Sequence, residues 1–161
     1  MVKKYVFAAA LCATALLAES CKTQKAVFSK TGGGLEYWIV RDVPGGRAAE
    51  AADFMDLHIK SHIQLETRDT ILYDSRTMNN NAPILFQVTM PPRLRGDISE
   101  GLLKLTEGDS AVFRIPVDSM DSDQLYSWME RGKNLKVEYT IKVARIRAKT
   151  EAPAMKGNSD R

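Results

Sequence analysis

Cysteine, histidine and aromatic residues are all scarce in this chain. Its 161 residues include two cysteines and two histidines, and aromatic residues make up 7% of the total. Cys12 lies in an apolar N-terminal segment that we expect to be removed, which leaves Cys21 without a partner. An internal disulfide is therefore excluded, although the chain has the features of an exported protein.

Neither sign of charge dominates the sequence. The formal net charge is +3, and removal of Lys3, Lys4 and Glu19 with the N-terminal segment leaves +2 on residues 21–161. Charges of both signs are interspersed, and no basic stripe with interleaved aromatics occurs. We therefore expect no nucleic acid partner.

A metal-ligand set and the motifs of nucleophilic catalysis are also missing. His58 and His62 lie four residues apart in a segment with strand periodicity, where they share one face and lack a further ligand. Solvent-exposed histidines are the simpler interpretation. No motif supports Ser/His/Asp catalysis, and we expect neither a metal nor a cofactor.

The first 21 residues resemble a bacterial lipoprotein signal. Lys3 and Lys4 precede an apolar run over residues 5–18 that is too short to span a bilayer comfortably. In such signals, the cysteine that follows a small residue is lipidated and becomes the new N-terminus. We interpret residues 1–20 as the signal and Cys21 as the lipidation site, which predicts a membrane-anchored lipoprotein of the bacterial cell envelope, on the periplasmic side or in the outer membrane. An ordinary signal peptide cut near Ala18 would instead leave Cys21 as a free thiol.

The rest of the chain divides into three parts. Residues 21–34 are polar and glycine-rich, which is typical of a flexible tether. Residues 147–161 are polar and charged, and we expect a disordered tail there. Residues 35–146 are about the size of one small domain with a single core.

Residues 96–116 carry the clearest structural signal. Ile98, Leu102 and Leu105 recur at the spacing of one helical face. Asp97 can cap the start of this helix, with Glu100 three residues later as in a capping box, and Gly108 can supply the left-handed residue at its end. The alternation of residues 111–115 then predicts a strand with one buried face.

Strand signals occupy most of the remaining domain. Alternating apolar residues over 55–64 and 135–146 predict two long strands, and shorter ones are expected at 35–43, 71–73 and 84–88. A second short helix is expected over residues 121–130. The order predicts an α+β domain in which a helix packs on one face of an antiparallel sheet.

Several motifs, taken in order, resemble FKBP-type peptidyl-prolyl isomerases. Residues 101–116 follow the pattern Gly-Leu-x-x-Leu-x-x-Gly-Asp-x-Ala-x-Phe-x-Ile-Pro. The other matches are Gly-Leu-x-Tyr-x-Ile at 34–39, Leu-His-Ile at 57–59, Tyr-Asp-Ser at 73–75, Pro-Ile-Leu-Phe at 83–86 and the final strand at 137–146. The resemblance covers most of residues 35–146 and implies an FKBP-like antiparallel sheet wrapped on one short helix.

The resemblance implies an apolar pocket between sheet and helix, where rotation about an X-Pro bond is catalysed without a nucleophile or a metal. Its catalytic residues would be Tyr73, Asp74 and Tyr139. Its substrate-binding residues would be Ile59, Ile84, Phe86, Leu94 and Ile98. For Asp74 a second interpretation stays open, namely a strand-ending turn in which its carboxylate caps a backbone amide.

Two departures from the family pattern concern this pocket. Asp97 and Ile98 stand where the family has a tryptophan floor, and residues 117–134 lack the family's Tyr-Gly loop over the pocket. We therefore expect a more aliphatic pocket. The first hypothesis is a monomeric isomerase that acts on proline-containing segments of exported proteins. The alternatives are a non-catalytic peptide-binding domain and a structural envelope lipoprotein.

Overall fold

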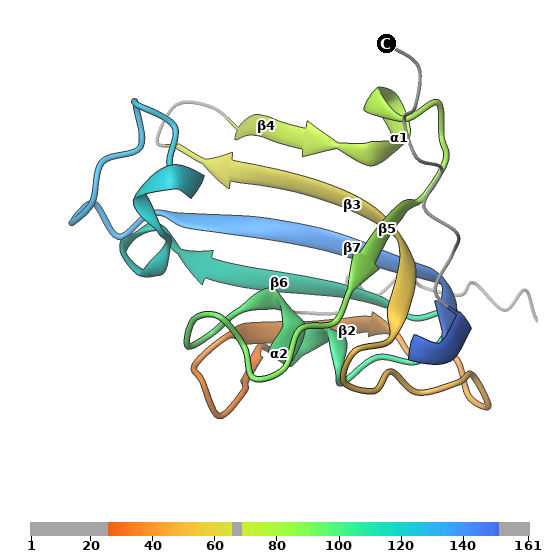
Figure 1. Ribbon diagram of the computed structural model, residues 1–161. Coiled ribbons are helices and arrows are strands. Elements are labelled where there is room, and N and C mark those ends of the chain that lie inside the picture. Colours follow the sequence, from red (N-terminus) through yellow and green to blue (C-terminus); the bar gives the residue numbers. More distant parts are fainter. Residues whose placement is uncertain (1–25, 66–68, 152–161) are drawn as a thin grey trace, which may run out of the picture.

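The computed structural model describes residues 26–65 and 69–151, and Figure 1 shows its arrangement. Residues 1–25, which include the predicted signal and Cys21, lie outside the described residues, as do 66–68 and 152–161. Within the described part, no helix is long and apolar enough to cross a membrane.

Seven antiparallel strands form a single sheet. Six follow the order β1-β2-β6-β7-β3-β4, and β5 pairs with the first half of β3. The strands are β1 Ser29–Lys30, β2 Glu36–Arg41, β3 Phe54–Gln64, β4 Asp69–Asp74, β5 Ile84–Gln87, β6 Ser110–Pro116 and β7 Lys136–Arg147. All six predicted strands are present, with ends shifted by at most two residues.

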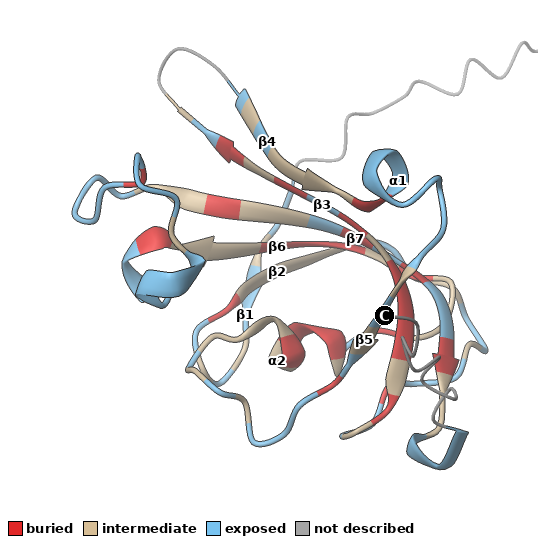
Figure 2. Cartoon of the chain, turned by 45° about the horizontal axis from the view of Figure 1, so that its top comes forward, coloured by how far each residue is buried: buried red, intermediate tan, exposed pale blue. Residues whose placement is uncertain are grey.

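Helical segments are few and short. They are α1 Ser75–Met78, α2 Ile98–Leu102, and the 3₁₀ turns η1 Val117–Ser119, η2 Ser122–Gln124 and η3 Lys149–Glu151. The curved sheet wraps around α2, which lies in its concave side and presents buried residues to it (Figure 2). This is the α+β arrangement that the sequence predicts.

The predicted helix after Gly96 is shorter than its apolar spacing suggests. Asp97 does cap it, since its Oδ1 accepts from the Ser99 amide at 2.7 Å. The helix ends at Leu102, and Leu105 reaches the core through a turn instead. Gly108, with φ of +95°, adopts the left-handed conformation in the turn before β6 rather than at the helix end. The helix predicted over 121–130 is wrong, because only the three-residue turn η2 forms there.

The main core lies between α2 and the sheet. Its fully buried side chains include Leu35, Leu57, Leu102, Phe113 and Ile141. A Cβ at Gly101 would lie 2.6 Å from Phe113 Cζ and 2.7 Å from Leu35 Cδ2. Helix and sheet thus approach as closely as they do because position 101 has no side chain.

A second, smaller core holds the segment between β6 and β7. Its buried members are Ile63, Val117, Met120, Met129 and Val137. The Arg131 guanidinium reinforces it by donating to the backbone oxygens of Asp118 and Met120. This segment is therefore packed against the sheet despite its lack of regular structure.

Both flanks of the predicted domain are more ordered than the sequence suggests. Residues 29–30, expected in a flexible tether, form β1 and pair with β2. Arg147, expected in the tail, ends β7 and forms an ion pair with Asp56 of β3. The ordered domain thus extends beyond residues 35–146 at both ends.

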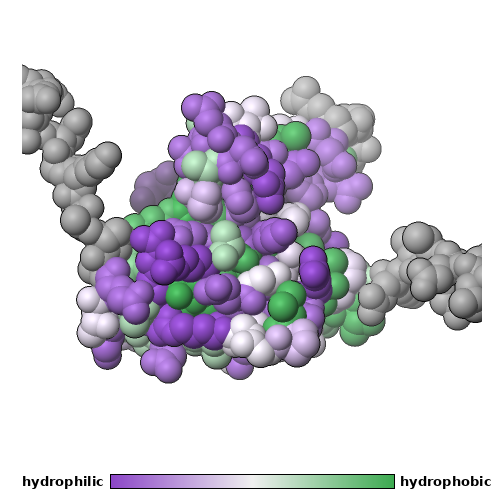
Figure 3. Space-filling model, turned by 90° about the vertical axis from the view of Figure 1, so that its right-hand side faces the viewer, coloured by the Kyte–Doolittle hydropathy of each residue, from purple (hydrophilic) through white to green (hydrophobic). Residues whose placement is uncertain are grey.

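The surface on the right-hand side of Figure 1 is mostly hydrophilic. Figure 3 shows this side with small hydrophobic areas scattered among polar ones.

Candidate functional site

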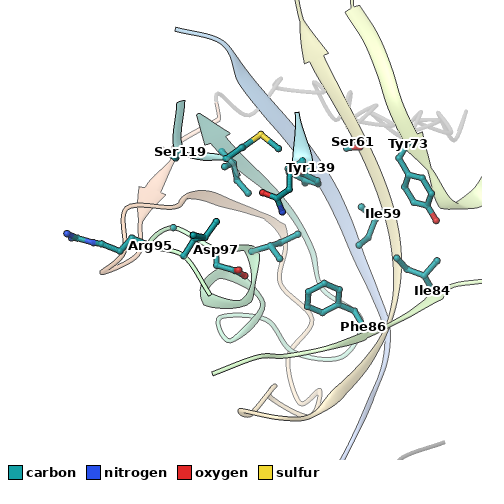
Figure 4. A pocket seen from close by; sticks show the side chains of 15 residues that line it. Ile59, Ser61, Tyr73, Ile84, Phe86, Arg95, Asp97, Ser119 and Tyr139 are labelled. Atoms are coloured by element: carbon teal, nitrogen blue, oxygen red, sulfur yellow. The ribbon is translucent and has the colours of Figure 1, made fainter. Parts of the chain in front are cut away.

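A cavity of about 320 Å³ lies between the concave face of the sheet and the start of α2 (Figure 4). Its walls come from β3, β4, β5, β6, β7, α2 and two connecting segments. The lining residues are Ile59, Ser61, Tyr73, Ile84, Phe86, Leu94, Arg95, Gly96, Asp97, Ile98, Ile115, Ser119, Met120, Gln124 and Tyr139.

Strand alternation places the apolar wall formed by β3 and β5. Ile84 and Phe86 are half-buried and line the cavity, while their neighbours Leu85 and Gln87 are exposed. On β3 the same alternation directs Ile59 inward, where it is 8% exposed. These side chains provide most of the apolar surface on this side of the cavity.

Tyr73, Ser61 and Tyr139 form a row across three neighbouring strands. The register pairs Ser61 of β3 with Tyr73 of β4 on one side and with Tyr139 of β7 on the other. A serine between two tyrosines leaves space that a larger side chain would fill. This row forms part of the lining in Figure 4, with an aromatic ring on each side of Ser61.

Tyr139 stays a neutral phenol well beyond physiological pH. Burial raises its pKa above the ordinary value, and the nearby Tyr126 raises it further. The hydroxyl therefore keeps its proton and can donate a hydrogen bond inside a largely apolar cavity.

Glu100 fixes the rim of the cavity at the start of α2. Its carboxylate accepts from the amides of Gly96 at 3.0 Å and Gly33 at 2.9 Å, and from the Thr31 hydroxyl at 2.5 Å. Burial alone would raise the Glu100 pKa, but these hydrogen bonds and the Arg95 charge lower it below its ordinary value. The predicted capping box is wrong in detail, because Glu100 bonds Gly96 instead of the Asp97 amide.

The connection between β6 and β7 forms the opposite wall. Ser119, Met120 and Gln124 line the cavity from this segment, which the second core cluster holds in place. Residues 117–134 lack the family's Tyr-Gly sequence, yet three of them line the cavity. Arg95, on the rim, points away from the cavity in Figure 4.

The cavity brings together all the predicted pocket residues except Asp74. Ile59, Tyr73, Ile84, Phe86, Leu94, Ile98 and Tyr139 line it. Asp74 instead caps α1, and its Oδ1 accepts from the Arg76 amide at 2.9 Å. It pairs with Lys60 on the opposite face of the sheet from Tyr73, because successive strand residues face opposite ways. The turn interpretation of Asp74 fits this geometry, and the pocket-edge position does not.

Several lining residues were not identified from the sequence. Ser61 and Ile115 could have been found, because they share the inward alternation of Ile59 and Phe113. Ser119, Met120 and Gln124 show no periodic signal, since tertiary packing alone places their segment.

The arrangement suits binding of a small apolar group. The lining combines three aromatic rings with branched aliphatic side chains, so a hydrophobic ring entering it would leave water. The hydroxyls of Ser61 and Tyr139 and the amide of Gln124 offer hydrogen bonds to polar atoms beside that ring. Across residues 26–65 and 69–151, no group of three or more His, Cys, Asp or Glu side chains is placed to hold a metal ion.

Comparisons with known proteins identify the architecture. No family model matches the sequence, and no curated protein matches it by sequence. Among solved structures, the chain is similar to FkpA from Escherichia coli, with a TM-score of 0.59 and 16% identity over 79% of this chain and 55% of that one. It thus spans about half the length of FkpA.

The chain is also similar to the N-terminal domain of FKBP42 from Arabidopsis thaliana. The TM-score is 0.59 and the identity 10%, over 76% of this chain and 94% of that domain. At such identities the likeness concerns the fold. The wrapped antiparallel sheet, the short helix in its concave side and these two likenesses show that the chain has an FKBP-like fold.

Proposed function

We propose that the chain is a peptidyl-prolyl cis-trans isomerase that acts on exported polypeptides. The observation that carries this proposal is the cavity of about 320 Å³, where Tyr73, Phe86 and Tyr139 join aliphatic side chains around an apolar space. A prolyl ring is small, apolar and compact, and it fits the chemistry of this lining.

The lining can lower the barrier to rotation without any covalent step. The uncatalysed barrier of about 18–20 kcal/mol arises from amide resonance, which the twisted transition state loses. An apolar wall holds the prolyl ring out of water, and the Tyr139 hydroxyl can hydrogen-bond to a peptide group that twists beside it. Catalysis then requires that these contacts bind the twisted amide better than either planar isomer.

A non-catalytic peptide-binding domain is the second candidate. The observation in its favour is the branched aliphatic Ile98 at the cavity wall, where a flat aromatic ring would offer more contact to a prolyl ring. Such a domain would hold proline-containing segments without accelerating their rotation. A purely structural envelope lipoprotein would do neither.

A prolyl peptide exchange experiment separates these candidates. Isomerisation of an Ala-Leu-Pro-Phe peptide is followed with the mature chain by a protease-coupled assay and by NMR exchange. We expect turnover, and we expect Ile84→Ala to reduce kcat/KM by about tenfold or more, since it removes apolar contact made in the cavity.

Leu85→Ala is the matched control for that variant. Leu85 is the next residue of β5 but is 47% exposed and faces away from the cavity. Equal loss in both variants would contradict the assignment of the cavity. Peptide binding without turnover would select the non-catalytic candidate, and the absence of both would overturn the two of them.

The cellular setting is a separate part of the proposal. We propose that Cys21 carries lipid and that the protein is a monomeric, membrane-anchored envelope lipoprotein whose clients are exported proteins with proline-containing segments. The support is the lipoprotein-like order of residues 1–21 and the lack of a partner cysteine. Mass spectrometry of the N-terminus from native membranes tests it, and an unmodified N-terminus at Glu19 with a free Cys21 thiol would overturn it.

A further inference from the structure

A second depression, of about 300 Å³, lies on the outer face of the sheet, away from the cavity. Ile59 and Ser61 line the cavity, so the alternate residues His58 and Lys60 point outward. The depression is lined by His58, Ile59, Lys60, Asp74, Arg76, Ser110, Thr140, Ile141 and Lys142.

Strand register brings the charged members of this set together. Lys142 of β7 pairs with His58 of β3, and Lys60 pairs with Thr140, so the two lysines are diagonal neighbours. Diagonal neighbours on one face of a sheet lie about 7–8 Å apart, within reach of long side chains. Arg76 in α1 contributes a third positive charge from the end of β4, and its guanidinium is held by the Asn81 side chain at 2.7 Å.

These three cations have little negative charge to balance them. Asp74 is the one carboxylate that lines the depression, and it lies directly opposite Lys60 in the register, so one negative charge faces three positive ones. In the described part of the chain, none of the three cations forms an ion pair. The carboxylates on neighbouring parts of this face are committed elsewhere, Asp56 to Arg147 and Glu138 to Arg114. Like charges placed this way destabilise the folded protein unless an anion lies between them.

Neutral hydrogen-bonding groups complete the depression. The Nδ1 atom of His58 is buried and has no hydrogen-bond partner among the described residues. The side chains of Ser110 and Thr140 also line the depression, and Ser110 pairs with Lys142 in the register. Burial lowers the His58 pKa, and the charges of Arg76 and Lys142 lower it further, which reports a positive potential at this point.

We propose that this depression binds a phosphate group, carried either by free phosphate or by a phospholipid headgroup. Lys60, Arg76 and Lys142 supply charge-assisted hydrogen bonds from three separate elements. Ser110 and Thr140 supply hydroxyl donors, and His58 supplies a ring nitrogen that can take up a proton when the anion arrives. The site is on the opposite face from the cavity, so it does not depend on isomerase activity.

Titration of the mature, unlipidated chain with inorganic phosphate tests the site. NMR should show shifts confined to His58 and its neighbours, and the His58 pKa should rise on binding, because a nearby anion favours the imidazolium. The charged groups that face His58 are Lys60 on its own strand, Asp74, Arg76 and Lys142. The double variant Lys60→Gln/Lys142→Gln should bind phosphate at least about tenfold more weakly, since two charged donors are lost.

Two further variants should respond differently from the double variant. Asp74→Asn keeps the helix cap but removes the competing charge, so phosphate should bind more tightly. Lys104→Gln, an exposed cation that follows α2 on the other side of the sheet, should leave binding unchanged. Folding stability of Lys60→Gln/Lys142→Gln should be equal to or above that of the parent, which a purely structural role of the lysines would not allow.

Vesicle sedimentation distinguishes the two sources of the phosphate. The same unlipidated chain is mixed with vesicles of phosphatidylglycerol and phosphatidylcholine, or of phosphatidylcholine alone. Binding to the anionic vesicles that is lost in the double variant assigns the headgroup, and phosphate shifts without vesicle binding assign the free anion. Binding of neither, or equal binding by parent and double variant, would overturn the proposal.

Discussion

Thr31 and Glu100 are joined by a hydrogen bond of 2.5 Å although 69 positions separate them in the chain. The same carboxylate accepts the Gly33 and Gly96 amides, so one side chain of α2 holds the segment before β2 and the rim of the cavity together. A Cβ at Gly33 would overlap the Glu100 carboxylate, which explains a glycine at this position.

Glu100→Ala should lower the free energy of unfolding by about 1–3 kcal/mol, because it leaves partly buried donors without their acceptor. The Glu100 pKa is lowered in the folded state, so its contribution is present above the unfolded pKa and is lost as the pH falls through the folded value. Urea denaturation at pH 7 and at pH 3 measures both effects. Glu50→Ala, at an exposed carboxylate, is the control and should change stability by less than about 0.5 kcal/mol.

A fragment of residues 26–151 should be measurably more stable than one of residues 34–146. The shorter fragment lacks β1, the Thr31 hydroxyl and the Arg147–Asp56 ion pair, and it leaves Asp56 without its partner. Thermal unfolding should show a difference of several degrees. Equal melting temperatures would mean that these flanking contacts contribute no net stability.

Gly101→Ala should destabilise the domain by about 1–3 kcal/mol, since its Cβ would lie within 2.7 Å of both Phe113 and Leu35. Gly32→Ala is a matched control, because a Cβ there meets nothing within 4 Å. Chemical denaturation of both variants checks the prediction. A stable Gly101→Ala variant would show that α2 can move away from the sheet at little cost.

Tyr73→Ala and Asp74→Ala should differ in their effect on turnover, although the two residues are adjacent. Tyr73 lines the cavity, so its loss should lower kcat/KM, whereas Asp74 faces outward and caps α1. Asp74→Ala should instead cost about 0.5–2 kcal/mol of stability through the lost cap. If Asp74→Ala lowers turnover in a fully folded protein, the carboxylate acts on the cavity in a way that its position does not suggest.

Ile98→Trp should raise kcat/KM on an X-Pro peptide, since a flat ring at the cavity wall offers more contact to a prolyl ring. The larger side chain also fills part of the cavity, and overpacking would cost about 1–3 kcal/mol. Stability and turnover are therefore measured on the same preparation. A folded variant with unchanged turnover would show that Ile98 does not contact the reacting bond.

The sequence predicts the sheet and its inward-facing residues well, for a physical reason. Residues on one face of a half-buried strand must alternate, and Ile59, Phe113 and Ile141 carry that pattern visibly. The helix at 98–102 is signalled equally clearly by its cap, although its length is not. Leu105 keeps its buried position through a turn, so its helical spacing overstated the helix.

The parts that could not be predicted depend on contacts between distant segments. Nothing in the local sequence of Ser29 and Lys30 indicates a strand, because both are exposed and their pairing with β2 is what orders them. Ser119, Met120 and Gln124 reach the cavity because Met120 and Met129 pack against β3 and β7 in the second core. The position of Asp74 could not be predicted for the same reason. Its motif suggested that it lines the cavity, but the pairing of β4 with β3 directs it to the outer face of the sheet.

The early start of β1 sets how far the domain could stand from a membrane. Eight peptide units separate Cys21 from Ser29, so a lipid on Cys21 would leave a reach of at most about 28 Å, whereas a tether ending at residue 34 would have allowed about 45 Å. If Cys21 is lipidated, the domain would therefore stay close to the bilayer surface. Its clients would be chains that pass close to that surface. Lengthening the segment between Cys21 and β1 would change which chains the domain can reach without altering its cavity.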